Sequence, residues 1–311
     1  MKALLLGDVH LSDTPPSVRT DSYAQDILDK LKWCVEFANA EDVDCIIQLG
    51  DMFHIKTPSR TSHRLVQATA KVLEQAEANF YVVPGNHDMQ HDRLESLSSQ
   101  PLGALALSPN VEVVDGLHWI HKFFAIPYTE NLIKLSLGID EAIKAGANLI
   151  VTHASIFPPE LHPPYDHITA DKIRTQGIPL AYGHIHDQHG FYLENGTWFC
   201  NNGAISRGSL HEETLKRHPE ATLFDSEFSK AGLCPFKRVP IPHKPAEEVF
   251  KLVEHQAKQE KAAKLDDFLD SVGGVTLQGL SVEEVVNHAE TSNLLDSQEI
   301  DEMKDIIETV S

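Results

Sequence analysis

Short apolar runs alternate with longer amphipathic stretches over roughly the first two thirds of the chain. Such runs are typical of buried strands, and the stretches between them have the spacing of crossover helices. Ile27, Leu31 and Val35 recur at helical spacing, and a second helix is predicted from Ser62 to Ala78. Strands are predicted at Ala3–Leu6, Val43–Leu49, Phe80–Val83, Val111–Val114, Trp119–Ile126, Asn148–Thr152, Leu180–Tyr182 and Thr197–Cys200. The pattern therefore predicts an α/β fold with packed sheets and helices outside them.

The pattern changes near residue 235. Four prolines between Pro235 and Pro245 predict a linker. Beyond it, apolar residues recur at helical spacing as far as Gly273, and a last helix is predicted after Asp296. The sequence therefore predicts a main domain over residues 1–243 and a small helical C-terminal region over residues 244–311.

The charge balance limits the kinds of partner that the protein can have. The net charge is −20, whereas a protein that holds nucleic acid through its overall charge is normally basic. Residues 244–311 contain 6 basic and 16 acidic residues, against 20 and 30 in the much longer stretch before them. The C-terminal helices are therefore expected either to expose a solvated acidic face or to present their apolar stripes to a partner.

Composition places the protein among globular intracellular proteins. Its hydrophobic fraction of 41% is ordinary, and neither a signal peptide nor a membrane span is recognisable. The cysteines, Cys34, Cys45, Cys200 and Cys234, are too scattered for a zinc ribbon or a thiol redox motif, so free thiols are expected. We expect a soluble cytoplasmic protein with no membrane contact.

Polar residues follow the predicted strands directly at five places. Because ligands bind at the carboxyl ends of strands in open α/β sheets, these five loops are expected to converge on one crevice. Taken alone, an Asp-x-His pair or a Gly-Asn-His-Asp turn is a common surface feature, and the order and placement of the whole set give the signal its specificity. The predicted metal ligands are Asp8, His10, Asp51, Asn86, His153, His184 and His186.

This ligand set indicates a two-metal phosphoesterase. Oxygen and nitrogen ligands without sulfur suit hard or borderline divalent ions. Asp51, presented by a tight glycine turn, is predicted to bridge the two ions. One ion would also take Asp8, His10 and His186, and the other would take Asn86, His153 and His184. Two such ions acidify a shared water, whose hydroxide would attack phosphorus, and they hold the phosphate oxygens in place.

Further residues are candidates for acid–base chemistry. His87 is placed to protonate the leaving oxygen, Asp88 to hold His87 in one tautomer, and His54 to reach the phosphate. Arg207 and the backbone near Gly203 either hold a phosphate or form a plain strand connection. Ten further histidines are expected on the surface or in loops: His63, His91, His118, His121, His162, His167, His189, His211, His218 and His243.

With these motifs, the sequence is identified as a member of the calcineurin-like metallophosphoesterase superfamily. This resemblance implies a four-layer α/β/β/α sandwich. The chain more narrowly resembles the SbcD-type nuclease, which acts with an SMC-like ATPase in DNA break repair. The narrower resemblance rests on Leu11 after Asp8-Val9-His10, on Gly50-Asp51-Met52-Phe53-His54, and on Pro58-Ser59-x-Thr61.

The narrower resemblance implies a function and partners. The activity would be exonuclease and endonuclease cleavage of DNA in end processing with two Mn²⁺ ions, and His54 and His87 would be the catalytic histidines. The protein would be a homodimer whose C-terminal helices dock on the coiled coil of an SbcC-type ATPase. The chain departs from this family in Gly203-Ala204, where Gly-Ser is usual, and in the short C-terminal region, which is expected to be a partner-docking or reduced DNA-capping element.

Two other functions remain open on the sequence. The same metal core serves small-molecule phosphodiesterases such as cyclic-nucleotide phosphodiesterases. A scaffold subunit that recruits an ATPase would also fit the C-terminal region, although the intact ligand set favours an enzyme. A protein serine/threonine phosphatase is disfavoured, because Met52-Phe53-His54 and Asp88 replace that branch's motifs.

Overall fold

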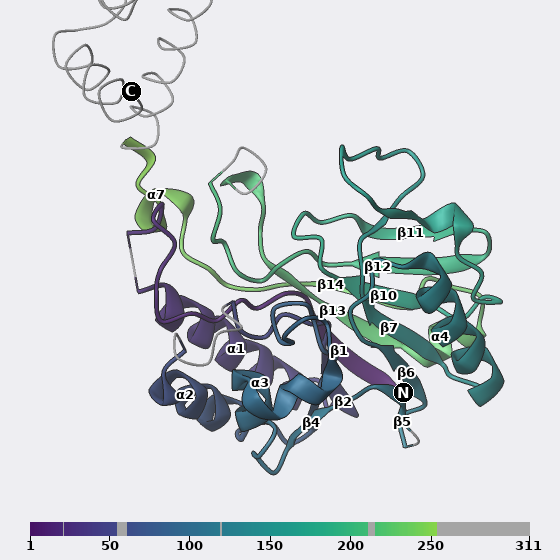
Figure 1. Ribbon diagram of the computed structural model, residues 1–311, viewed down its shortest axis with the longest axis horizontal. Helices are drawn as coiled ribbons and strands as arrows, with labels where there is room; N and C mark the ends of the chain where they lie inside the picture. The colour runs from purple at the N-terminus through teal and green to yellow at the C-terminus, as the bar shows by residue number, and fades with distance from the viewer. Residues whose placement is uncertain (21, 55–60, 119, 211–214, 254–311) are drawn as a thin grey trace, which may run out of the picture. The chain divides into compact units, whose positions relative to one another are not determined.

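The computed structural model describes residues 1–253 apart from residues 21, 55–60, 119 and 211–214. Its described part contains two six-stranded sheets and a two-stranded one (Figure 1). The helices predicted beyond residue 253 lie outside the described residues. No helix in the described ranges is long and apolar enough to cross a membrane.

The first sheet is built around the N-terminal strand. Its order is β14-β13-β1-β2-β3-β4, and β1 pairs in parallel with β2 and antiparallel with β13. The register places Ala3 opposite Cys45 on one side and opposite Phe224 on the other. The strands of this sheet are β1 (Lys2–Leu6), β2 (Cys45–Gln48), β3 (Asn79–Val82), β4 (Val111–Val113), β13 (Glu220–Asp225) and β14 (Phe236–Pro240).

The second sheet has the order β11-β12-β10-β7-β6-β5, and its central strands β6, β7, β10 and β12 are parallel. Its strands are β5 (Gly116–His118), β6 (Phe123–Ile126), β7 (Leu149–His153), β10 (Leu180–Gly183), β11 (Gly190–Glu194) and β12 (Thr197–Asn201). The short strands β8 (Ile156–Phe157) and β9 (Ile168–Thr169) form the third, two-stranded sheet.

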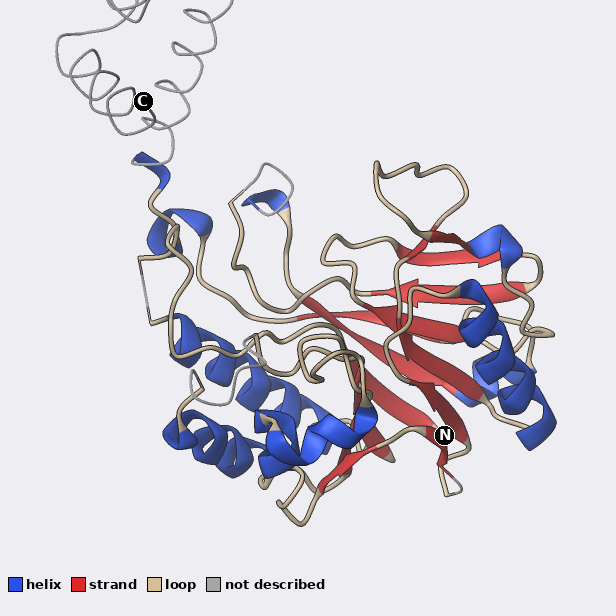
Figure 2. Ribbon diagram, in the orientation of Figure 1, coloured by secondary structure: helices blue, strands red, loops and turns tan. Residues whose placement is uncertain are grey.

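Alternate residues of the strands face different cores, so the molecule is layered. In β1, Leu4 and Leu6 pack toward the helices, while Ala3 and Leu5 pack toward the second sheet. Successive side chains of a strand point to opposite faces, and both faces of these strands are buried. Figure 2 shows the helices on the outer sides of the two sheets. The predicted four-layer α/β/β/α sandwich is confirmed.

The outer layers are helical. Helices α1 (Tyr23–Ala40), α2 (His63–Leu73) and α3 (Pro101–Leu105) cover the first sheet, and α4 (Leu132–Ala145) covers the second. The Ser62 hydroxyl caps α2 by accepting from the Leu65 N–H, which explains why that helix begins there. The remaining short helices are η2 (Leu94–Ser99), η3 (Ala170–Lys172), α6 (Ser226–Lys230) and α7 (Ala246–Val249).

The structure corrects two predicted elements. The segment from Pro235 to Pro245 is not a plain linker, because Phe236–Pro240 forms the edge strand β14 against β13. Prolines are tolerated at the ends of an edge strand, so they concealed it in the sequence. Likewise, β5 and β6 form a hairpin, whereas a single strand was predicted over residues 119–126.

The short helix α7 (Ala246–Val249) and Phe250 pack onto the rest of the first compact unit, which runs from Met1 to Phe250. Val249 and Phe250 are buried, and the guanidinium groups of Arg19 and Arg207 lie over the Phe250 ring. Residues 246–250 therefore belong with the first unit.

Candidate metal centre

Five loops that follow strands of both sheets converge on one place. The first sheet contributes Asp8 and His10 after β1, Asp51 after β2 and Asn86 after β3. The second sheet contributes His153, the last residue of β7, and His184 and His186 after β10. The loops are tied together directly, because the N–H groups of Val9 and His10 both donate to the Asp51 carbonyl. The predicted convergence is present, and the ligand roles of these residues stay a prediction.

Asp8, His10 and His186 form a first group of donor atoms that lie within 4.8 Å of one another. The Nε2 atoms of His10 and His186 are 2.8 Å apart. The Asp8 Oδ2 atom lies 3.7 Å from Nε2 of His10 and 3.5 Å from Nε2 of His186. Three donor atoms therefore face a common point.

Asp51, His153 and His184 form a second group of the same kind, and Asn86 joins it. The Asn86 Oδ1 atom lies 3.1 Å from His153 Nε2 and 3.2 Å from His184 Nδ1. Nδ1 of His153 donates to the Leu49 carbonyl over 2.7 Å, because a carbonyl can only accept. This hydrogen bond fixes the tautomer and leaves Nε2 for the centre of the group.

Asp51 lies between the two groups. Its Oδ2 atom is 3.3 Å from His153 Nε2 in the second group and 3.7 Å from His10 Nε2 in the first. Its Oδ1 atom accepts from the His87 N–H over 2.8 Å, which fixes the carboxylate orientation. One carboxylate oxygen is thus within reach of both groups, as a bridging ligand must be.

The buried charges fit a pair of divalent cations. Within the described residues, Asp8 Oδ2 is buried and has no hydrogen-bond donor. Burial lowers the pKa of His10 to about 3 and that of His184 to about 4, so both rings offer neutral lone pairs at neutral pH. Burial by itself would lower the pKa of His153. The negative charges of Asp51 and Asp8 outweigh this effect and raise the pKa to about 9. Carboxylates that favour a protonated imidazole equally favour a metal ion.

Three of the nine described non-glycine residues with positive φ belong to the two donor groups. His10, Asp51 and His184 adopt φ angles of 50°, 58° and 84°, a region that non-glycine residues seldom occupy. Such strain costs free energy and persists where the surrounding structure enforces it for function. Close packing adds a constraint, because a Cβ on Gly85 would stand 2.2 Å from Asp51 Oδ1. Gly85 therefore leaves room for the Asp51 carboxylate, which is predicted to bridge the two ions.

His54 and His87 lie beside the first group. Their rings stack with centroids 5.4 Å apart, and each lies within 5.3 Å of the His10 ring centroid. Nδ1 of His87 donates to the His54 carbonyl over 2.6 Å, which leaves Nε2 for a substrate. Burial, followed by the charge of His87, lowers the pKa of His54, so that ring is neutral at neutral pH.

Asp88 does not hold His87 in place, so that prediction is wrong. Its buried carboxylate accepts from the N–H groups of Gly85 and Asp51 through Oδ2 and from that of Met52 through Oδ1. Burial, followed by the charge of Asp51, raises the pKa of Asp88 to about 7. Asp88 instead fastens the loops after β2 and β3 to each other.

The predicted phosphate contact by Arg207 and Gly203 is also corrected. Arg207 is 2% exposed, donates to the Lys244 carbonyl and stacks on Phe250, away from the donor groups. The Gly203 N–H donates to the Asn201 side chain, and the N–H groups of Ala204 and Ile205 donate to the carbonyls of His186 and Asp8. The loop thus holds the backbone of two predicted ligands, Asp8 and His186.

Buried arginine and lysine side chains donate hydrogen bonds to the backbone carbonyl groups of this loop. The sequence did not indicate these contacts. Nη1 of Arg217 donates to the carbonyls of His186 and Ala204, and its Nη2 donates to that of Ser206. Lys30 Nζ donates to the Ile205 carbonyl, and Arg19 donates to that of Arg207. No local motif marks these roles, because they depend on where distant carbonyls lie.

Asp26 offsets part of this buried positive charge. Its Oδ2 atom lies 3.2 Å from both Arg19 Nη2 and Lys30 Nζ. We predict that Asp26→Asn lowers the free energy of unfolding by about 3–5 kcal/mol, because it removes the carboxylate from a buried ionic cluster. Urea unfolding measures the loss. The exposed neighbour Asp29→Asn is the control, and equal stability of the two variants would contradict the structural role of Asp26.

Within the described residues, His118 departs from the prediction, whereas His189 lies in a loop as predicted but is half-buried. His118 is buried in β5 and stacks on Phe123, with centroids 5.1 Å apart. His189 is partly buried, and its Nδ1 lies 2.8 Å from the Tyr182 hydroxyl. Both rings fill aromatic clusters, which a list of single histidines does not reveal.

Comparison with known proteins places this geometry in context. The family model of the calcineurin-like phosphoesterases matches residues 1–188. The chain is similar to the DNA double-strand break repair protein Mre11 of Sulfurisphaera tokodaii, with 34% identity over 83 residues, 26% of this chain and 21% of that protein. It is similar to the Mre11 protein of Haloferax volcanii, with 24% identity over 211 residues, 66% of this chain and 46% of that protein.

The chain thus spans less than half the length of these curated relatives. Among solved structures, it is similar to a dimetal phosphatase from Danio rerio. That comparison has a TM-score of 0.48 and 14% identity, and it covers 78% of this chain and 99% of the other.

Proposed function

Because the chain belongs to the calcineurin-like phosphoesterase family, we propose that this metal-dependent phosphoesterase is a nuclease that cleaves DNA phosphodiester bonds with two Mn²⁺ ions. The observation that carries the proposal is the position of His54 and His87 directly beside the paired donor groups. A phosphodiester has a poor leaving group, so its hydrolysis gains from a nearby proton donor. The likeness to proteins named for DNA double-strand break repair favours DNA as the substrate.

The residues divide the chemical work between them. Two ions in this site would supply an acidified water and neutralise charge on the phosphate. Asp51 holds the two donor groups in register, and the loop of residues 203–205 fixes Asp8 and His186 from behind. Nε2 of His87 delivers a proton to the departing oxygen, since Nδ1 is committed to the His54 carbonyl. His54, which is neutral at neutral pH, donates a hydrogen bond to the phosphate.

The proposal is tested by assaying the purified protein with manganese, magnesium or zinc on four substrates. These are linear duplex DNA, single-stranded DNA, a cyclic nucleotide and bis(4-nitrophenyl) phosphate. Cleavage of DNA that manganese supports best is the expected result. Hydrolysis of the cyclic nucleotide or the small ester without DNA cleavage would instead identify a small-molecule phosphodiesterase, and inactivity on all four with metals bound would favour a scaffold.

We also propose that the protein works as a homodimer and binds an SbcC-type, SMC-like ATPase through its acidic C-terminal region. The amphipathic pattern of that region supports the proposal, because apolar stripes on an acidic segment suit docking to another helical protein. The site for this partner lies largely beyond residue 253, outside the described residues. Light scattering of the purified chain tests the dimer separately.

Truncation after Phe250 should abolish binding of the ATPase while sparing hydrolysis of bis(4-nitrophenyl) phosphate. The cut belongs there because Val249 and Phe250 are buried in the first unit, so an earlier cut would expose Arg19 and Arg207. Co-purification with a coexpressed ATPase measures binding, and full-length protein is the control. Retention of the ATPase by the truncated protein would contradict the docking proposal.

A further inference from the structure

The two donor groups differ in how far water reaches their ligands. In the second group, His153 is fully buried. In the first group, Asp8 is fully buried as well, whereas the His186 side chain is 48% exposed. A cavity of 340 Å³, which His10 and His186 line, opens on this side. An ion in the first group would therefore rely on one ligand that is in contact with solvent.

The exposed His186 ring has little to hold it in place. Its Nε2 atom faces the centre of the group, 2.8 Å from Nε2 of His10. Histidines that bind a metal almost always donate their other ring N–H to an acceptor, which fixes the ring. His153 does so through the Leu49 carbonyl, but within the described residues no hydrogen bond holds Nδ1 of His186. The position of this ring therefore depends on its backbone.

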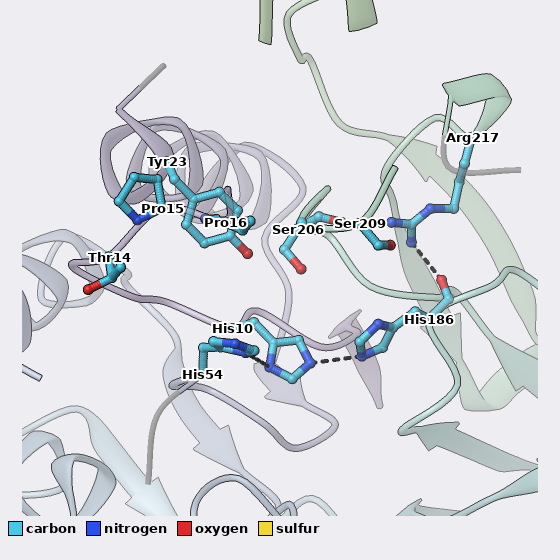
Figure 3. A pocket seen from close by; sticks show the side chains of 11 residues that line it. His10, Thr14, Pro15, Pro16, Tyr23, His54, His186, Ser206, Ser209 and Arg217 are labelled. Carbon is cyan, nitrogen blue, oxygen red and sulfur yellow. Dashed lines mark hydrogen bonds between the residues drawn. The ribbon is translucent and has the colours of Figure 1, made fainter. Parts of the chain in front are cut away.

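Arg217 holds that backbone. Its Nη1 atom donates to the His186 carbonyl over 2.6 Å, a contact that Figure 3 shows beside the cavity. The same guanidinium group donates to the carbonyls of Ala204 over 2.6 Å and of Ser206 over 2.7 Å. Arg217 is 8% exposed, and hydrogen bonds from a charged donor in such a buried place are strong. One side chain thus fastens His186 to the loop behind it.

The charge of Arg217 by itself would act against a metal ion. Arg217 lies close enough to Asp8 for their charges to interact, so it also lies near an ion that Asp8 binds. Like charges repel, so removal of the guanidinium charge alone would tighten binding of that ion. Loss of the hydrogen bond to the His186 carbonyl would weaken it instead. The direction of the change in affinity therefore separates these two roles of Arg217.

We propose that Arg217 is a positioning residue that sets the affinity of the first ion by holding the backbone of His186. The ion in the second group does not depend on Arg217, because His153 is buried and is fixed by the Leu49 carbonyl. The inference rests on the ligand role of His186 in the proposed function, and it deepens that function by naming a residue that controls one of the two ions.

Titration of the metal-free, full-length protein with manganese measures the affinities of both ions. Arg217→Met should weaken one ion about 10–100-fold, the usual effect of losing a residue that orients a metal ligand, and should leave the other unchanged. Anomalous diffraction from crystals at limiting manganese assigns the weakened ion to a donor group. The expected position is the group of Asp8, His10 and His186.

Arg19→Met is the matched control. Arg19 is 3% exposed and also donates to a carbonyl of this loop, that of Arg207, which is not a predicted ligand. The variant should keep both manganese affinities, even where the protein becomes less stable. An equal loss of the first ion in Arg19→Met would show that any loosening of the loop weakens the site, and it would overturn the specific role of Arg217.

Arg217→Lys guards against misfolding of Arg217→Met. Lysine keeps the charge but lacks the planar fork that reaches several carbonyls at once, so the first ion should still weaken, by a smaller factor. A folded variant at position 217 with both wild-type affinities, or with a more tightly bound first ion, would overturn the inference and leave the nuclease proposal untouched. The expected affinities in a protein that cleaves no DNA would support the inference and refute the nuclease proposal.

Discussion

Replacement of His87 by alanine is expected to lower turnover about 10²–10⁴-fold while both metal ions remain bound. His87 touches the centre through its backbone, whose N–H donates to Asp51 Oδ1, and alanine keeps that hydrogen bond. The imidazole is lost, and with it the proposed donor of the proton to the leaving oxygen. Activity on a diester with a poor leaving group should therefore fall further than activity on one with a 4-nitrophenyl leaving group.

Steady-state kinetics with metal analysis of the same samples measures this outcome. His63→Ala, an exposed histidine at the start of α2, is the matched control and should retain full turnover. A His87→Ala protein that comes out metal-free would show that the ring is needed as a ligand, and the assigned role of a proton donor would be wrong.

Replacement of Asp51 by asparagine should weaken binding of both ions at once and lower turnover by more than about 10³-fold. Asparagine keeps nearly the same shape and can still accept from the His87 N–H. It loses the charge that Oδ2 presents to both donor groups, 3.7 Å from His10 and 3.3 Å from His153. The mutual repulsion of two cations is then no longer offset.

Titration of metal-free protein with manganese distinguishes a ligand that both ions share from a ligand that binds one ion only. The wild type is expected to bind two ions, and in Asp51→Asn both affinities should fall together. Asp29→Asn removes an exposed carboxylate of α1 and should change neither affinity. Loss of a single ion from Asp51→Asn would mean that this carboxylate serves one ion only.

The positions of the predicted ligands could be derived from the sequence because each of them lies directly after, or at the end of, a strand in the chain. Asp8, Asp51 and His153 each follow an apolar run, and strand ends in parallel sheets meet at one edge. The layered fold followed in the same way, from apolar runs and helical spacing. The strand β14 was not predicted, because the prolines at and near its ends indicated a linker.

Other roles depend on distances that no local pattern encodes. Asp88 follows His87 in the chain, yet its side chain turns to backbone N–H groups near Asp51. Arg217 holds the carbonyl of His186, 31 residues away in the chain. The sequence indicated Arg207 as the arginine that contacts phosphate. In the structure its guanidinium group lies over the Phe250 ring instead.

The central position of β1 has a consequence for synthesis on the ribosome. Lys2–Leu6 is synthesised long before its antiparallel partner Glu220–Asp225. Until then one edge of β1 lacks its neighbour, and open strand edges are prone to pair with other chains. The nascent protein therefore completes its first sheet late, and chains released before β13 is made should depend on chaperones to escape aggregation.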